Sequence, residues 1–317
     1  MDITRRNFFM GALASAAMPA VARARTAGGK DPDLSVFLSD IHVASAEIKT
    51  EWGKQPDYQN AYFMKAVDEI LAMRPLPARV VVFGDVALWF GWHQDYERSL
   101  PGFKRLKDAG IDVFVTTGNH DHREPLFKHH PHQAEITPVP GRFVSVIGLG
   151  SADLFLMDTL KENPAGEGTK NAVDGALDEA QQQWLLQAAK AAKRPFFVGA
   201  HHDADEVKMG KEKLMYALER FPLFAGYICG HHHRYFRKWY HNGYSNRHVS
   251  RLVCLPSTGW WGDIGYAVMR TFPDRAELRL VENDFFFPRP LAKGEARPPE
   301  WDDIIAENRG SVSVFRY

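Results

Sequence analysis

Five strand-like apolar runs in this chain each end in residues of the types that bind metal ions. The runs are followed by Asp40-Ile41-His42, Gly84-Asp85, Gly118-Asn119-His120-Asp121, His201-His202 and Gly230-His231-His232-His233. In open α/β sheets, ligands bind at the carboxyl ends of the strands. A single Asp or His at such a place is usually a turn former or a structural residue, but turn chemistry does not explain five in this order. The sequence therefore predicts a sheet edge that collects Asp, Asn and His side chains.

Helical patterns separate the strand-like runs over the first two thirds of the chain. Helices are expected over 58–73, 95–108, 175–192 and 204–220, and a hairpin of two strands around Gly150-Ser151. After residue 230 the helical patterns stop, and strand-like runs follow at 248–257, 264–272 and 276–283. This order predicts an α/β fold with a parallel sheet and a second, mostly antiparallel sheet.

The first 28 residues are typical of an export signal. Arg5 and Arg6 precede an Ala-rich apolar stretch that is short for a spanning helix, and small residues follow at 20–24, so the segment resembles a twin-arginine signal. A short membrane anchor is the alternative. We expect a signal at 1–28, one large domain at 29–287 and a Pro-rich, loosely packed extension at 288–317. The mature protein is then periplasmic or secreted, and the twin-arginine translocation machinery is a partner.

Charge and cysteine content narrow the classes of partner. Lys plus Arg and Asp plus Glu are equal at 39 each, so no long-range attraction to nucleic acid or to an anionic membrane is expected. No later segment approaches the length of a membrane-spanning helix. The two cysteines, Cys229 and Cys254, lie in apolar runs and are expected to be buried thiols rather than a disulfide.

The number of donors decides how many ions such a sheet edge would hold. The candidate ligands are seven: Asp40, His42, Asp85, Asn119, His201, His231 and His233. One catalytic ion typically uses about three protein ligands and keeps a position open, so seven donors fit two ions that share a carboxylate. Oxygen and imidazole donors without thiolate favour Fe, Mn, Zn or Co. Two ions about 3.5–4 Å apart can clamp the attacking and leaving oxygens of a phosphoryl displacement and lower the pKa of a bridging water.

The ordered motifs resemble those of the calcineurin-like metallophosphoesterases. The matching motifs are D-x-H at 40–42, G-D at 84–85, G-N-H-D at 118–121, the position of His201, and G-H-x-H at 230–233, and the resemblance covers about residues 34–283. It implies a metallophosphoesterase domain at 29–287, built as two packed mixed β-sheets flanked by helices in a four-layer sandwich. The implied ligands are Asp40, His42, Asp85 and His233 for one ion, and Asp85, Asn119, His201 and His231 for the other. The resemblance also implies that His120 protonates the leaving oxygen and that Asp121 orients His120.

Several assignments near these motifs stay open. His202 is the alternative to His201 as a ligand, since adjacent imidazoles are chemically equivalent candidates. His232 should point away from the ions, because alternate side chains of an extended segment face opposite ways.

Aromatic and basic residues border the motifs. Trp89, Phe90, Trp92, Trp260 and Trp261 either pack with one another or stack on a flat organic group of a substrate. Arg123 and Arg234, with His202, are candidate substrate contacts, and each arginine is equally an ion-pair partner. The histidines 129, 130 and 132 are expected to lie in a solvated loop, with a third metal or a substrate contact as the alternative.

These features predict an exported dinuclear phosphoesterase that hydrolyses a small phosphomonoester or phosphodiester by attack of metal-bound hydroxide. Residues 84–91 lack the arginine found there in protein Ser/Thr phosphatases, and Leu88 stands where purple acid phosphatases have a tyrosine ligand. The alternative within enzymes is a cyclic-nucleotide or glycerophosphodiester phosphodiesterase. The alternative from another class is a catalytically inactive metal-bearing binding module, against which the intact His120 argues.

Overall fold

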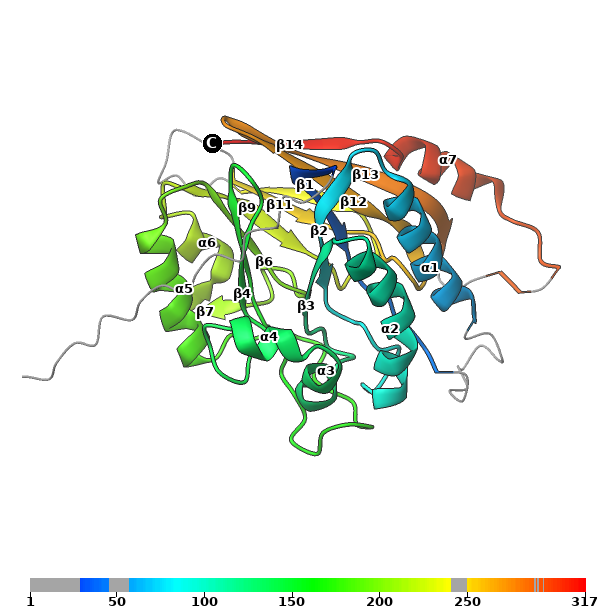
Figure 1. Ribbon diagram of the computed structural model, residues 1–317, viewed down its shortest axis with the longest axis horizontal. Helices are drawn as coiled ribbons and strands as arrows, with labels where there is room; N and C mark the ends of the chain where they lie inside the picture. Colours follow the sequence, from blue (N-terminus) through cyan, green and yellow to red (C-terminus); the bar gives the residue numbers. More distant parts are fainter. Residues whose placement is uncertain (1–28, 46–56, 241–249, 288, 290, 293) are drawn as a thin grey trace, which may run out of the picture.

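Two six-stranded sheets pack face to face and carry helices on both outer sides. The computed structural model describes residues 29–45, 57–240, 250–287, 289, 291–292 and 294–317. Helices α1 (Asp57–Ala72) and α2 (His93–Asp108) lie on one outer side, and α5 (Glu179–Ala191) and α6 (Leu214–Leu218) lie on the other (Figure 1). This four-layer α/β arrangement confirms the fold class predicted from the sequence.

Both sheets are mixed. The first runs in the order β14 (Val312–Arg316), β13 (Arg275–Phe286), β12 (Gly262–Phe272), β1 (Lys30–Leu38), β2 (Leu76–Phe83) and β3 (Asp112–Thr116), and its strands β1 to β3 are parallel. The second runs in the order β10 (Phe236–Tyr240), β11 (Ser250–Cys254), β9 (Phe224–Cys229), β6 (Phe196–Gly199), β5 (Asp153–Leu156) and β4 (Ser145–Gly148), with β10 and β4 as antiparallel edges.

The expected separate antiparallel sheet is wrong. The late strands are divided between the two sheets: β11 pairs parallel with β9, and β12 pairs antiparallel with β1. An unpaired sheet edge presents backbone N–H and C=O groups that need partners, and these late strands supply them.

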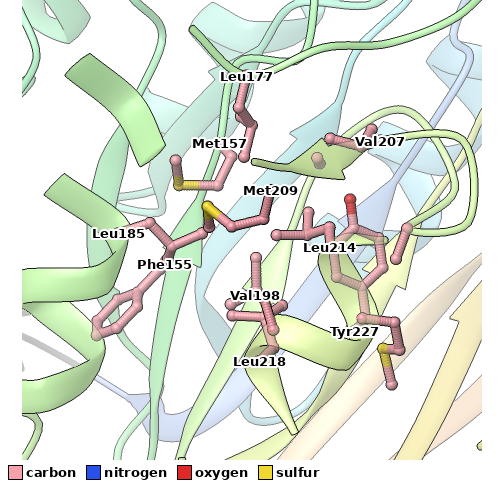
Figure 2. Packing of buried hydrophobic residues seen from close by; sticks show 14 of the residues in the cluster. Phe155, Met157, Leu177, Leu185, Val198, Val207, Met209, Leu214, Leu218 and Tyr227 are labelled. Carbon is pink, nitrogen blue, oxygen red and sulfur yellow. The ribbon is translucent and has the colours of Figure 1, made fainter. Parts of the chain in front are cut away.

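Apolar side chains fill three layers, one between the sheets and one under each pair of helices. The central layer includes Phe37, Val81, Phe83, Phe197, Ile228 and Met269. Their chain neighbours face outward, as Val80 and Val82 do toward the layer under α1 and α2. In the layer of the second sheet, Phe155, Met157 and Val198 pack with side chains of α5 and α6 (Figure 2). Because both faces of the central strands are buried, these strands are continuous apolar runs in the sequence.

The helices follow their local signals with one exception. Helix α5 begins at Glu179, later than expected, because the Asp178 carboxylate accepts the N–H of Gln181 at 2.9 Å and caps the helix. The helix expected over 204–220 is mostly wrong. A short hairpin of β7 (Lys208–Met209) and β8 (Glu212–Lys213) precedes the five-residue α6, and Gly210 turns between the two strands with a φ of 62°. The apolar residues of this segment still reach the core, so their spacing alone did not reveal the turn.

The end of the chain is part of the sandwich rather than a loose extension. It forms α7 (Pro299–Asn308), which packs on β13, and β14, which pairs antiparallel with β13. Phe315 of β14 is 1% exposed and packs edge-on against Phe197, with the ring centroids 5.0 Å apart. The prolines of this segment lie before the helix or at its first position, where they do not interrupt it.

Two further expectations concern export and cysteines. Cys229 and Cys254 are buried free thiols in neighbouring strands, as predicted. Across the described ranges, no helix combines the length and apolar character needed to cross a membrane. The predicted signal at 1–28 lies outside the described residues.

Candidate metal centre

The sheet register brings the first two motifs side by side. Strands β1 and β2 are parallel, and past their ends the N–H of Asp40 donates to Gly84 O at 3.1 Å and the N–H of His42 to Asp85 O at 3.0 Å. The second sheet reaches the same place, because Nδ1 of His201 faces Phe83 O at 2.8 Å. All seven predicted ligands thus follow the carboxyl ends of strands and lie at one edge of the sandwich.

One donor set consists of Asp40, His42, Asp85 and His233, and these four buried residues are arranged so that they could hold a metal ion. Nε2 of His42 lies 3.0 Å from Nε2 of His233 and 3.7 Å from Oδ2 of Asp85. Nε2 of His233 lies 3.3 Å from Oδ1 of Asp40.

The tautomers of His42 and His233 place two ring nitrogens without hydrogens opposite each other. His42 Nδ1 lies 3.1 Å from Leu88 O, and His233 Nδ1 lies 2.8 Å from Trp260 O. A carbonyl oxygen only accepts, so each Nδ1 carries a hydrogen and each Nε2 presents its lone pair. Two such lone pairs 3.0 Å apart need a proton or a metal cation between them. The donor chemistry therefore fits the metal ion that the sequence predicts.

The second donor set is built around His201. Its Nε2 lies 3.1 Å from Oδ1 of Asn119, 3.2 Å from Oδ2 of Asp85 and 3.2 Å from Nδ1 of His231. The same oxygen of Asp85 faces both sets, while its other oxygen accepts the N–H of His120 at 2.8 Å. Asp85 therefore lies between the two donor sets.

Backbone strain is concentrated at these residues. Within the described ranges, the non-glycine residues with positive φ are Asp40 (50°), His42 (43°), Asp85 (49°), His231 (74°) and His233 (54°). All five are candidate ligands. Such conformations cost of order 1–3 kcal/mol each and cluster at functional sites. This signal comes from the structure and is independent of the sequence motifs.

The turn at His231 corrects the expected geometry of the last motif. The segment is not extended, because His231 and His233 both have positive φ, so alternation along a strand does not explain their common direction. His232 does point elsewhere, with Nε2 at 3.7 Å from an Asp203 oxygen and 3.6 Å from a Glu206 oxygen.

The charges of the centre suit cations. Burial tends to raise the pKa of Asp40, but the neighbouring His233 holds it well below its usual value, and His201 does the same for Asp85 against the effect of burial. Burial lowers the pKa of His42 and of His231 to about 3, so both side chains are neutral at neutral pH, as a histidine that binds a metal must be. Burial opposes protonation of His201, but Asp85 raises its pKa to about 9. A bound cation would take the place of that proton.

His120 lies at the edge of both sets. Its Nδ1 donates to Trp89 O at 2.9 Å, and its Nε2 lies 4.0 Å from Oδ2 of Asp85. The carbonyl fixes the ring so that Nε2 faces the centre, and the side chain is partly open to solvent. The expected orientation of His120 by Asp121 is wrong, because the group on Nδ1 is a backbone carbonyl.

The Asp121 carboxylate instead forms hydrogen bonds that join the second motif, at 84–85, to the third, at 118–121. Its carboxylate accepts the N–H groups of Val86 at 3.1 Å, Ala87 at 3.0 Å and Gly118 at 2.9 Å, and the hydroxyl of Tyr96 at 3.2 Å. Burial, with repulsion from Asp85, raises the pKa of Asp121 to about 7. Backbone donors on three residues make it a structural support for the loops that carry Asp85 and Asn119.

The structure separates His201 from His202. His202 places Nδ1 2.8 Å from the Thr159 hydroxyl, and its ring packs edge-on against His201 with centroids 4.9 Å apart. A ligand atom of His202 does lie within 4.8 Å of those of His201 and His231. The contacts of His201 with Asp85 and Asn119 nevertheless favour His201 as the ligand.

The candidate substrate contacts have different surroundings. Arg123 directs its guanidinium to Asp158 at 2.7 Å and Glu162 at 2.9 Å, as expected of the ion-pair alternative. Trp260 is 4% exposed and meets Trp89 edge-on with centroids 4.6 Å apart, so these two pack together beside the centre. Arg234 is exposed and lies over the ring of Phe287.

The histidines after the third motif do not form a solvated loop. Helix α3 (Arg123–His129) and α4 (Pro131–Ile136) meet at His130, which is fully buried and lies edge-on to Phe103 of α2 with centroids 5.1 Å apart. The expectation is wrong because α3 packs against α2 and covers this corner.

Residues 157–178 also support the third motif, and none of the sequence motifs indicated this. This long segment between β5 and α5 has no helix or strand. Its buried Asn171 donates to the carbonyls of Asn119 at 3.0 Å and Asp121 at 2.7 Å, which fixes the third motif from outside. The length was the available signal, because irregular loops beyond about 12–15 residues are usually functional or disordered.

Comparisons with known proteins bear on the family and on the fold. The model of the calcineurin-like phosphoesterase family matches residues 35–235. No curated protein sequence matches the chain. Among solved structures, PhoD is similar with a TM-score of 0.55 and 11% identity, over 89% of this chain and 69% of that chain. The protein TT1561 of Thermus thermophilus has a TM-score of 0.42 and 11% identity, over 75% of this chain and 94% of that chain. At these identities the likeness to PhoD supports the fold alone.

Proposed function

Because the chain belongs to the calcineurin-like phosphoesterase family, we propose that it hydrolyses a small phosphomonoester or phosphodiester at a centre of two metal ions. The proposed ligands are Asp40, His42, Asp85 and His233 for one ion, and Asp85, Asn119, His201 and His231 for the other. The ions are drawn from Fe, Mn, Zn and Co, which suit oxygen and imidazole donors.

The observation that best supports this proposal is that a single oxygen of Asp85 lies close to both donor sets. One of its carboxylate oxygens lies 3.7 Å from Nε2 of His42 and 3.2 Å from Nε2 of His201. One ion cannot use all seven donors and keep a place for substrate, whereas two ions that share a carboxylate can.

The reaction is an in-line displacement at phosphorus. When bound, the metal ions supply Lewis acidity, which activates water and stabilises negative charge on the phosphoryl oxygens. The bond from the water oxygen to phosphorus forms, and the bond from phosphorus to the ester oxygen breaks. The water gives up a proton, and the departing ester oxygen gains one to become an alcohol.

His120 is the proposed proton donor to the departing oxygen. Its Nδ1 hydrogen is held by Trp89 O at 2.9 Å, so the proton on Nε2 is the one directed at the centre. When Nε2 gives up this proton, the hydrogen bond from Nδ1 to Trp89 O remains, so the ring keeps its orientation. A binding module without activity would need the ligands but would not need this side chain.

We also propose export by the twin-arginine route, with the mature protein in the periplasm or secreted. Arg5, Arg6 and the Ala-rich stretch after them support this. Replacing both arginines by lysine should leave the precursor inside the cell, and immunoblots of cell fractions would show it. Unchanged export of that variant would contradict the twin-arginine route.

The proposed function is tested by metal analysis together with a substrate panel. The purified protein, saturated with Mn, Zn, Fe or Co, should retain about two ions per chain after gel filtration, as the donor count requires. It should hydrolyse p-nitrophenyl phosphate, bis-p-nitrophenyl phosphate or cyclic AMP. Fewer than about two ions would contradict the two-ion centre. Two ions without hydrolysis of any ester would favour the binding module.

A further inference from the structure

A row of aromatic side chains leads from a candidate metal ligand to the protein surface. The Trp261 ring stacks on the His233 ring, with centroids 4.7 Å apart and planes inclined by 28°. Phe287 follows, with its centroid 5.5 Å from that of Trp261. Since His233 belongs to one donor set, the row starts where a phosphate would be bound.

Exposure distinguishes the outer end of this row from the neighbouring tryptophans. Phe287 is 45% exposed and Trp261 is partly exposed, whereas Trp260 is buried. Trp260 and Trp89, for which the sequence allowed either mutual packing or stacking on a substrate, contact each other and the site imidazoles. Large apolar side chains that stay open beside a polar centre mark a ligand surface.

The positively charged side chain of Arg234 lies beside Phe287, the outer ring of this row. Arg234 directly follows His233 in the chain. Its guanidinium carbon lies 5.9 Å from the centroid of the Phe287 ring. Arg234 is attracted electrostatically by Asp263, but within the described residues it makes no direct ion pair of the kind that Arg123 makes with Asp158 and Glu162. Its charge therefore favours an anionic ligand, and its side chain holds the ring of Phe287 in place.

We propose that Trp261, Phe287 and Arg234 bind an aromatic substituent of the phosphoester, so that the enzyme prefers aryl or aralkyl esters over alkyl esters. This inference rests on the proposed function. Aromatic rings attract one another beyond their apolar area, so the preference should be about tenfold in affinity.

Two phosphonates test the preference without turnover. Benzylphosphonate carries a ring and ethylphosphonate does not, and the carbon–phosphorus bond of each resists this hydrolysis. Titration calorimetry of the metal-loaded protein should give a Kd about tenfold lower for benzylphosphonate. Phe287→Ala should bring the two Kd values together by weakening benzylphosphonate alone. Arg234→Met should weaken both phosphonates. The control is Tyr216→Ala on α6, which removes a ring of similar exposure, 43%, and should change neither Kd.

Kinetics on p-nitrophenyl phosphate and ethyl phosphate provide the second measurement. Phe287→Ala should raise KM for the aryl ester several-fold and raise KM for the alkyl ester much less, whereas Tyr216→Ala should leave both esters unaffected. Equal Kd values for the two phosphonates in the wild type would overturn the aromatic surface while hydrolysis still supports the proposed function. An unchanged preference in Phe287→Ala would also overturn it. No phosphonate binding and no hydrolysis would overturn both.

Discussion

The Nε2 atoms of His42 and His233 lie 3.0 Å apart, and each ring has its other nitrogen committed to a backbone carbonyl. Neither ring can turn away without losing that hydrogen bond, so the fold holds two lone pairs in contact. A cation held by Asp40, His42, Asp85 and His233 would remove the repulsion between these lone pairs. The folded state should therefore be strongly stabilised by metal.

Removal of metal should lower the melting temperature. A ligand at about 100 times its Kd stabilises the folded state by about 2.7 kcal/mol per site, which for a chain of this size corresponds to about 5 °C. The chelated protein should melt about 5–10 °C below the reconstituted one in scanning calorimetry, depending on whether one or two ions bind. Asp85→Asn should abolish most of this difference. Equal melting temperatures of the two wild-type forms would contradict a metal centre here.

The proton donor should be separable from the ligands. His120→Gln should keep both ions and lower kcat by roughly 10²–10⁴, the usual range for a general acid. The loss should be smaller for p-nitrophenyl esters than for alkyl esters, because p-nitrophenolate leaves without a proton. Metal analysis and kinetics on the two ester classes check this. Loss of metal in this variant would show that His120 is a ligand instead.

A close approach of backbone to ligand explains one glycine of the third motif. A Cβ added to Gly118 would overlap Oδ1 and the backbone nitrogen of Asp85. Gly118→Ala should therefore push the shared carboxylate out of place and abolish tight metal binding, even if the protein still folds. Gly166→Ala is the matched control, since a Cβ there meets nothing within 4 Å despite the positive φ of 74°. Calorimetric metal titration of both variants makes the comparison, and normal binding by Gly118→Ala would refute it.

The gathering of the candidate ligands could be predicted from the sequence because each follows a strand, and the parallel register of β1 with β2 makes neighbouring strand ends coincide. The supports of these ligands could not be predicted in the same way. The family resemblance implied that Asp121 orients His120, yet the Asp121 carboxylate accepts backbone N–H groups from residues 86, 87 and 118. Backbone partners carry no sequence signal. The hydrogen bond from His120 to Trp89 O was hidden for the same reason.

Elements far from the motifs were harder to predict for another reason. The segment 204–220 has apolar residues at spacings that suit both a helix and a hairpin that packs on a core, and tertiary packing decided between them. His130 lies in a polar stretch, so only the packing of α3 against α2 shows that it is buried. The turn at His231 required positive φ, which local sequence disfavours for a non-glycine residue.

His130 should make stability depend on pH. Burial lowers its pKa to about 3, against 6.5 for the ordinary side chain. The unfolded chain therefore binds a proton below pH 6.5 that the folded chain does not accept until about pH 3. Stability is intact above pH 6.5 and falls as the pH drops through that value, by about 2 kcal/mol at pH 5.

His130→Phe should remove this dependence. Both ring nitrogens of His130 lack a hydrogen-bond partner among the described residues, so an apolar ring of similar size should be tolerated. Urea unfolding of the chelated wild type and variant at pH 7.5 and pH 5 measures how much unfolding free energy each protein loses between the two pH values. The variant should lose about 2 kcal/mol less between the two pH values. Equal losses in both proteins would mean that His130 is protonated or solvated in the folded state.

Phe315 tests whether the end of the chain belongs to the fold. A loose extension would tolerate any change there, whereas a buried ring in an edge strand would not. Phe315 is 1% exposed and contacts Phe197 of the central layer, so Phe315→Ala should leave a cavity and cost about 3–5 kcal/mol of unfolding free energy. Phe90→Ala is the control, since that ring is 37% exposed and its removal should cost far less. Urea unfolding of both variants measures the difference. Equal small costs would mean that β14 detaches from β13 in solution and that residues 312–316 contribute little to the first sheet.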